Sequence, residues 1–264
     1  MAIHVLIPCS KTKSIGPSKE LIWDEGVSLV DWVSSWNNTV LDTFEVRNLY
    51  TGRATRNQLE MVEERTDAYP YLISAGAGLV RVNDGVKIPS YEATFGNFGP
   101  SLEEWCKLPC GGLSNIEFEE GDVIVAFAPP RYLKAIYKDP EIDRLWEYIV
   151  APESSCLGKY CGFPVNVHPR IKEILGVGAA DLNTELIRIF LELGVAGIEK
   201  SSDLAGKLPP LPERKSVDDE ELLKIVKQHH RDKTLMELIR FIRDNLQISA
   251  SVERISKARK IVHQ

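Results

Sequence analysis

The stretch Val5-Leu6-Ile7-Pro8-Cys9-Ser10-Lys11-Thr12-Lys13 joins a short apolar run to a polar segment that carries a thiol, hydroxyls and amines. An apolar run of this length is typical of a buried central strand in an open α/β sheet. Ligands of such sheets bind beyond the carboxyl ends of the strands. We therefore expect Cys9, Ser10 and Lys13 to lie at the mouth of a crevice.

The same pattern recurs along the chain. Tyr71–Ala75 and Val123–Ala128 are apolar runs that end in short loops, and residues 162–167 predict a further strand. Helical spacing of apolar residues is found over 21–36, 56–65, 131–137 and 182–193, and Gly194 is expected to end the last of these helices. This alternation predicts a three-layer α/β fold with a mainly parallel sheet.

Composition excludes several classes of protein. Apolar residues make up 44% of the 264 residues, and no apolar run approaches the roughly 18 residues that a membrane span needs. The start, Met1-Ala2-Ile3-His4, lacks the basic segment of a secretory signal. Five cysteines argue against a disulfide framework, and Cys106-x3-Cys110 and Cys156-x4-Cys161 lack the spacing of zinc ligands. We expect a cytoplasmic protein that binds no membrane, metal or cofactor, and the sequence indicates no oligomeric state.

Clustered prolines in Lys207-Leu208-Pro209-Pro210-Leu211-Pro212 favour an extended connector between two domains. We place an α/β core domain at 1–206 and a small, all-helical domain at 213–264. The second domain has 12 Lys/Arg against 9 Asp/Glu, so it carries about +3 of a total charge of -6. The C-terminal segment is therefore the basic part of the chain.

The tail contains two predicted helices joined by a short polar turn, Leu235–Asn245 and Ser251–Ile261. Their apolar residues can share a small core, in outline like a helix-turn-helix. The cations then expected to be exposed, as a nucleic-acid-binding surface, are Arg240, Arg243, Arg254, Lys257 and Arg259. The alternative is a solvated, charged face of a helical bundle or a surface that docks another protein.

The candidate catalytic groups Cys9, Ser10 and Lys13 cluster after the first strand. A helix N-terminus and the amine of Lys11 or Lys13 would favour the thiolate of Cys9, which could then attack an activated carbon. The alternative is a small buried cysteine that lets the loop turn, with Lys13 binding a phosphate beside Ser10. Glu92, on a polar loop, is a candidate general acid or base.

Candidate substrate-binding residues follow the later strands. Tyr91 could stack on a base, and the backbone at Gly76 and Gly78 could approach a ligand closely after Ser74. Arg131 and Tyr132 could clamp a phosphate or stack on a base. Tyr50 is a weaker candidate of the same kind.

Three motifs stand in a fixed order: Pro8-Cys9-Ser10-Lys11-Thr12-Lys13, Leu49-Tyr50-Thr51-Gly52, and Ile73-Ser74-Ala75-Gly76-Ala77-Gly78-Leu79-Val80. The order resembles that of small domains related to the YaaA-type peroxide-stress proteins. The PCSxxK pattern and the ISAxxGLV loop are also similar to those of the core domain of archaeosine synthase, which modifies a 7-deazaguanine base in tRNA. The resemblance covers roughly residues 3–140.

The resemblance implies an enzyme that acts on a nucleobase, free or within DNA or RNA, by base modification of the 7-deazaguanine type or as a glycosylase. Its partner would be a nucleic acid or a nucleotide. The alternative is a stress- or defence-related protein that grips phosphates in the same crevice without turnover. A third possibility is an interaction module.

Overall fold

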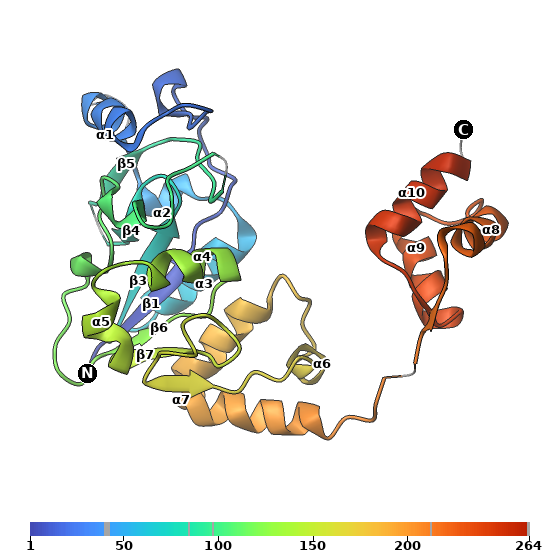
Figure 1. Ribbon diagram of the computed structural model, residues 1–264. Coiled ribbons are helices and arrows are strands. Elements are labelled where there is room, and N and C mark those ends of the chain that lie inside the picture. The colour runs from blue at the N-terminus through green and yellow to red at the C-terminus, as the bar shows by residue number, and fades with distance from the viewer. Residues whose placement is uncertain (40–42, 84, 97, 212, 263–264) are drawn as a thin grey trace. The chain divides into compact units, whose positions relative to one another are not determined.

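The computed structural model describes residues 1–39, 43–83, 85–96, 98–211 and 213–262. It divides into two compact units, Met1–Lys207 and Leu208–Gln264 (Figure 1). Pro212, in the proline-rich connector, and residues 263–264, at the end of the second predicted domain, lie outside the described residues. In the described parts of the chain, no helix combines the length and the apolar character that crossing a membrane requires.

A six-stranded sheet with the order β4-β3-β1-β6-β7-β8 forms the centre of the first unit. Val5, Leu6 and Ile7 are fully buried because β1 has a parallel partner on each side, β3 and β6. β4 is antiparallel to β3, and the other pairs are parallel. The strands of this sheet are β1 (Ile3–Pro8), β3 (Ala68–Ser74), β4 (Gly78–Arg81), β6 (Val123–Val125), β7 (Ile149–Pro152) and β8 (Phe163–Val165).

Helices cover both faces of this sheet. The chain moves from β1 to β3 in one direction across the sheet and from β6 to β7 in the other. Right-handed crossovers therefore place α3 and α4 on opposite faces, and α3 packs against β1, β3 and α7. The helices are α1 (Leu29–Asn38), α2 (Val46–Leu49), α3 (Arg53–Glu63), α4 (Pro130–Tyr137), α5 (Ile142–Leu145), α6 (Ile171–Leu175) and α7 (Leu182–Gly206), and β2 (Thr43–Glu45) pairs with β5 (Lys87–Pro89). The predicted mixed fold with a mainly parallel sheet is confirmed.

Two strands differ from the sequence-based expectation. The segment after Ser74, expected to be a ligand-binding loop, turns back at once and forms β4. β7 (Ile149–Pro152) lies outside the apolar runs from which strands were predicted. Both short strands are stabilised by pairing with neighbouring strands of the sheet. The pattern of residues within one segment does not show such pairing.

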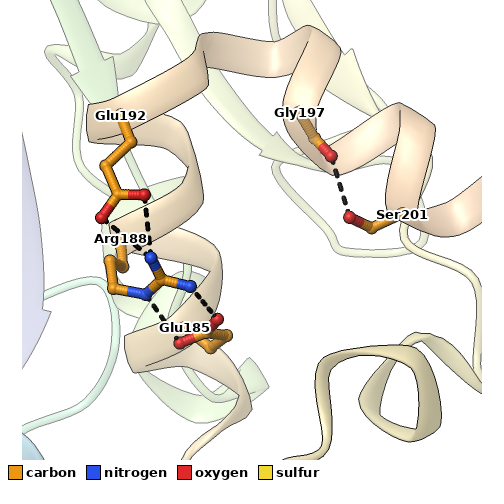
Figure 2. Close-up of polar contacts among 5 residues, drawn as sticks. All are labelled: Glu185, Arg188, Glu192, Gly197 and Ser201. Atoms are coloured by element: carbon orange, nitrogen blue, oxygen red, sulfur yellow. Dashed lines mark hydrogen bonds and ion pairs between the residues drawn. The ribbon is translucent and has the colours of Figure 1, made fainter.

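α7 extends well beyond its predicted end. Gly194 has φ 66° and ψ -164°, so it interrupts the helical geometry as expected, but the helix resumes after it. Figure 2 shows the two parts: Arg188 binds Glu185 and Glu192 before the bend, and the Ser201 hydroxyl donates to the Gly197 carbonyl after it, at 3.0 Å. The second part continues because Ile198 and Ala205 bury apolar surface.

The second unit has its own small apolar core. Leu222, Val226, Leu238, Ile242 and Ile255 are at most 1% exposed. Its elements are α8 (Asp219–His229), α9 (Leu235–Arg240) with a π-helical turn at Phe241–Asn245, α10 (Val252–Val262), and the parallel two-residue strands β9 (Lys215–Ser216) and β10 (Ile248–Ser249). The unit is thus helical apart from one short strand pair.

Three of the five cations that we expected to be exposed on this unit instead form hydrogen bonds or ion pairs within it. Arg243 donates to the Ala250 carbonyl, and Arg259 donates to that of Lys233. Arg254 pairs with Asp219 at 2.7 Å and also donates to a backbone carbonyl. All three are half-buried, because a guanidinium with five donors readily satisfies backbone carbonyls. The other two of the five, Arg240 and Lys257, are exposed.

Candidate functional site

A cavity of 780 Å³ opens at the carboxyl ends of β1, β3 and β6. Its wall is formed by the loop after β1, the N-terminus of α3, the segment Tyr91–Phe95 and the start of α4. Cys9, Ser10 and Lys13 all line it, together with Arg131 and Tyr132. The crevice expected beyond the end of the first strand is therefore present and brings these five side chains together.

Cys9 continues directly from β1. Its amide donates to the Ile73 carbonyl at 3.1 Å, and its own carbonyl accepts the Tyr132 hydroxyl at 3.0 Å. Desolvation raises the pKa of the thiol, although the charge of Lys13 acts in the opposite direction. The expectation of a thiolate favoured at rest is therefore wrong: removal of water outweighs the neighbouring amine.

Lys13 lies above two aromatic rings. Its Nζ is 4.3 Å from the centre of the Tyr91 ring and 5.5 Å from that of Tyr50. Desolvation lowers the pKa of the amine, and the charges of Cys9 and Glu92 partly oppose this. Burial thus favours the neutral forms of both Cys9 and Lys13.

A hydrogen-bonded network fixes Tyr91 from behind the cavity wall. Its hydroxyl bonds to that of Tyr50 at 2.5 Å and also to the Ser74 hydroxyl. The Ser74 Oγ in turn accepts the Ala77 amide at 3.0 Å. Ser74 and Tyr50 are fully buried and do not line the cavity. They were predicted to bind substrate, but they position Tyr91, which does line the cavity.

Gly76 and Gly78 are required by the protein's own packing. A Cβ at Gly76 would lie 2.6 Å from the Tyr91 ring, and one at Gly78, where φ is +98°, would lie 2.2 Å from the Gly111 carbonyl oxygen. Neither glycine lines the cavity. The space beside these two glycines is therefore filled by the Tyr91 ring and the Gly111 carbonyl, and not by the cavity in which a ligand could approach them.

Gly52 lines the cavity, although it was not among the site residues predicted from the sequence. It precedes α3, its amide donates to the Ser10 Oγ at 3.1 Å, and a Cβ there would lie 2.4 Å from the Ser10 Cβ. Ser10 also donates to the Thr12 carbonyl at 2.7 Å, so its hydroxyl shapes the loop and is not poised for the catalytic role predicted for it. The motif Leu49-Tyr50-Thr51-Gly52 contained the signal, but a glycine before a helix does not reveal which loop it touches.

The N-terminus of α3 lines the cavity, and its N-cap residue, Gly52, has no side chain to accept the amides of the first turn. Two contacts brace this helix: Thr55 donates to the Pro8 carbonyl at 3.1 Å, and Arg53 pairs with Asp181 at 2.7 Å. The amides of the first turn have no acceptor within the helix, so they can bind an anion.

The remaining predicted residues, Glu92, Arg131 and Tyr132, also line the cavity. Glu92 is exposed and lines the cavity, and its backbone is held by hydrogen bonds to Leu21 and Trp23, both at 2.8 Å. Arg131 is exposed, whereas Tyr132 is buried and meets the Phe95 ring edge to face at 5.2 Å. A carboxylate, a guanidinium and two aromatic rings therefore surround the entrance.

Within the parts of the chain that the structure describes, no group of three or more His, Cys, Asp or Glu side chains could hold a metal ion. The chemical groups that line the cavity include a thiol, an amine, a carboxylate, a guanidinium and the N-terminus of α3. Searches with family models, against curated proteins and against solved structures found no match to this chain.

Proposed function

We propose that this chain is an enzyme that modifies a nucleobase, either in a free nucleotide or within a nucleic acid. The observation that carries the proposal is the convergence of Cys9 and Lys13 in one cavity beside an anion-binding helix end. Aromatic rings at Tyr132 and Phe95 supply a surface on which a base can stack. The order of the PCSxxK, LYTG and ISAxxGLV motifs supports kinship with the YaaA-type and archaeosine-synthase core domains, which we propose as well.

The reaction starts from a neutral pair. The Cys9 sulfur adds to an electrophilic carbon of the base, such as that of a C=N bond, and the thiol proton passes to the Lys13 amine. The electron pair of the attacked bond moves to the nitrogen of the base, and Lys13 returns the proton there. The step uses a thiol and a neutral amine, the forms that desolvation favours at these two residues.

Other features fit this role. All five cysteines are free, which supports a reducing compartment, and we propose the cytoplasm. Glu92 at the rim can exchange protons with the substrate, and Arg131 can bind a phosphate. Glycosidic-bond chemistry is the other reaction that a carboxylate beside a bound nucleoside would support.

The test is turnover with a panel of nucleotides, DNA and tRNA, followed by mass spectrometry of the bases. We expect one substrate to change mass with the intact chain. Cys9→Ala should abolish the change, and Cys156→Ala, at a half-buried free cysteine outside the cavity, should leave it intact. Binding of a nucleotide or nucleic acid without any change of the base would instead support the non-catalytic phosphate-binding role.

A further inference from the structure

Gln58 on α3 carries a buried hydrogen-bond acceptor that the protein leaves unused. The residue is 1% exposed and lines the cavity. Its Nε2 donates to the Thr184 hydroxyl at 2.8 Å, whereas its Oε1 accepts no hydrogen bond from any described residue. Since about nine in ten buried polar atoms are paired, a ligand that donates to this oxygen would complete the site.

The same helix presents amide donors at its other end. Gly52, Arg53 and Ala54 line the cavity at the start of α3, and Ser10 takes only the Gly52 amide. Gln58 is five residues beyond Arg53, the first residue of the helix, or about 7.5 Å further along the helix axis. The cavity therefore combines a helix N-terminus that can bind an anion with one free hydrogen-bond acceptor, the Gln58 Oε1. The two are separated by roughly the length of one sugar.

The charge of this unit favours a small anion over a polymer. Residues 1–207 carry 20 Lys/Arg against 29 Asp/Glu, a net charge of -9. A polyanion that ran over the surface would meet this repulsion along its length, whereas a single phosphate is bound locally by the amides at the start of α3. The cavity volume of 780 Å³ lies in the range that holds one small molecule.

We infer, on the basis of the proposed function, that the substrate is a free ribonucleoside monophosphate. Its phosphate binds at the N-terminus of α3 between the Ser10 loop and Lys13. A ribose hydroxyl donates to the Gln58 Oε1, which directs the base towards the aromatic side of the cavity at Phe95 and Tyr132. The ribose hydroxyl supplies the hydrogen-bond donor that the unpaired Gln58 Oε1 lacks within the protein.

The experiment is calorimetric titration of the full chain with AMP, GMP, CMP and UMP. Each is compared with its nucleoside, with its 5′-phosphate methyl ester, and with its 2′,3′-dideoxy form. We expect at least one monophosphate to bind about tenfold or more tightly than its nucleoside, because charge-assisted hydrogen bonds are lost without the phosphate. The methyl ester, which mimics a polymer linkage, should also bind more weakly.

Gln58→Leu removes the acceptor and keeps most of the volume. We expect it to weaken binding of the ribonucleotide about fivefold and to leave binding of the dideoxy form unchanged. Asn57→Leu, at the exposed neighbouring position on α3, is the matched control. If Gln58→Leu does not fold, the ratio between ribo- and dideoxynucleotide affinities of the intact chain, expected to be about fivefold, tests the same hydrogen bond.

The outcomes separate the two proposals. Equal affinity for nucleotide and nucleoside, or for ribo- and dideoxynucleotide, overturns this inference and leaves the proposed function standing. Tight binding of single-stranded nucleic acid with no measurable affinity for any monophosphate has the same consequence. If no nucleotide, DNA or tRNA is altered by the chain, the proposed function itself fails, whatever the mononucleotide affinities.

Discussion

Desolvation acts in opposite directions on the two reactive residues of the cavity. It raises the pKa of Cys9 and lowers that of Lys13, so the separated charges are disfavoured. Each charge would stabilise the other, which makes proton transfer between them sensitive to what enters the cavity.

The pH dependence of alkylation tests this view of Cys9. Because its pKa is raised by desolvation, we expect slow reaction with iodoacetamide near pH 7 and a midpoint above that of a free cysteine. Lys13→Met should raise the midpoint further, since the charge of Lys13 acts to lower this pKa. Mass spectrometry of the Cys9 peptide gives the rates, and a plateau already reached at pH 7.5 would contradict the prediction.

The buried His4 side chain leads to a prediction of how the free energy of unfolding depends on pH. Its Nε2 lies 3.3 Å from an oxygen of Asp122, and desolvation lowers its pKa. The unfolded chain therefore binds this proton more readily than the folded chain, so stability falls as the pH drops below about 6.5. We expect the free energy of unfolding, measured in urea, to decrease between pH 7 and pH 5.

His4→Gln, which does not titrate, should show a flatter profile over the same range. An unchanged slope in this variant would assign the pH dependence to other groups.

The residue-level predictions failed where side-chain direction mattered. The pattern Ile73-Ser74-Ala75 shows where a strand ends, but whether Ser74 points to the cavity or into the protein depends on Tyr91, which is distant in sequence. Cys9 was placed correctly at the strand end, yet its pKa depends on how completely neighbouring elements exclude water. Contacts between segments decided both cases, and no local pattern encodes them.

At the scale of elements, runs of apolar residues were informative and small residues were ambiguous. β1, β3, α3 and α4 fall close to their predicted positions because each has a strong period or a long buried run. The Gly76–Gly78 segment is equally typical of a ligand loop and of a hairpin. Only pairing of β4 with β3 distinguishes them.

The bend in α7 gives a prediction at this scale. At φ 66° and ψ -164°, Gly194 occupies a region that is essentially restricted to glycine. Gly194→Ala should lower the free energy of unfolding by about 1–3 kcal/mol. Urea denaturation followed by circular dichroism measures the change.

Gly206 supplies the control for this substitution. It ends the same helix, and a Cβ there would meet only the His168 ring, at 4.0 Å. Gly206→Ala should be neutral or slightly stabilising, because alanine loses less backbone entropy. If both variants lost equal stability, the backbone of Gly194 would not be the cause.

The whole molecule combines two units of opposite charge. Residues 1–207 carry -9 and residues 213–264 carry +3, and each unit buries its own apolar cluster. Within the second unit, Arg214 pairs with Asp244 and Lys215 with Glu221. Some of the charges of this unit are thus paired within it.

Removal of the second unit tests the independence of the first. We expect a chain that ends at Lys207 to unfold cooperatively and to retain the nucleotide affinity of the full chain, because the cavity lies wholly within Met1–Lys207. Thermal denaturation and calorimetric titration of the two chains give the comparison. Loss of nucleotide affinity in a shortened chain that still shows a cooperative transition would mean that the C-terminal unit contributes to the site. A shortened chain that does not fold would show that the core of the first unit requires the second.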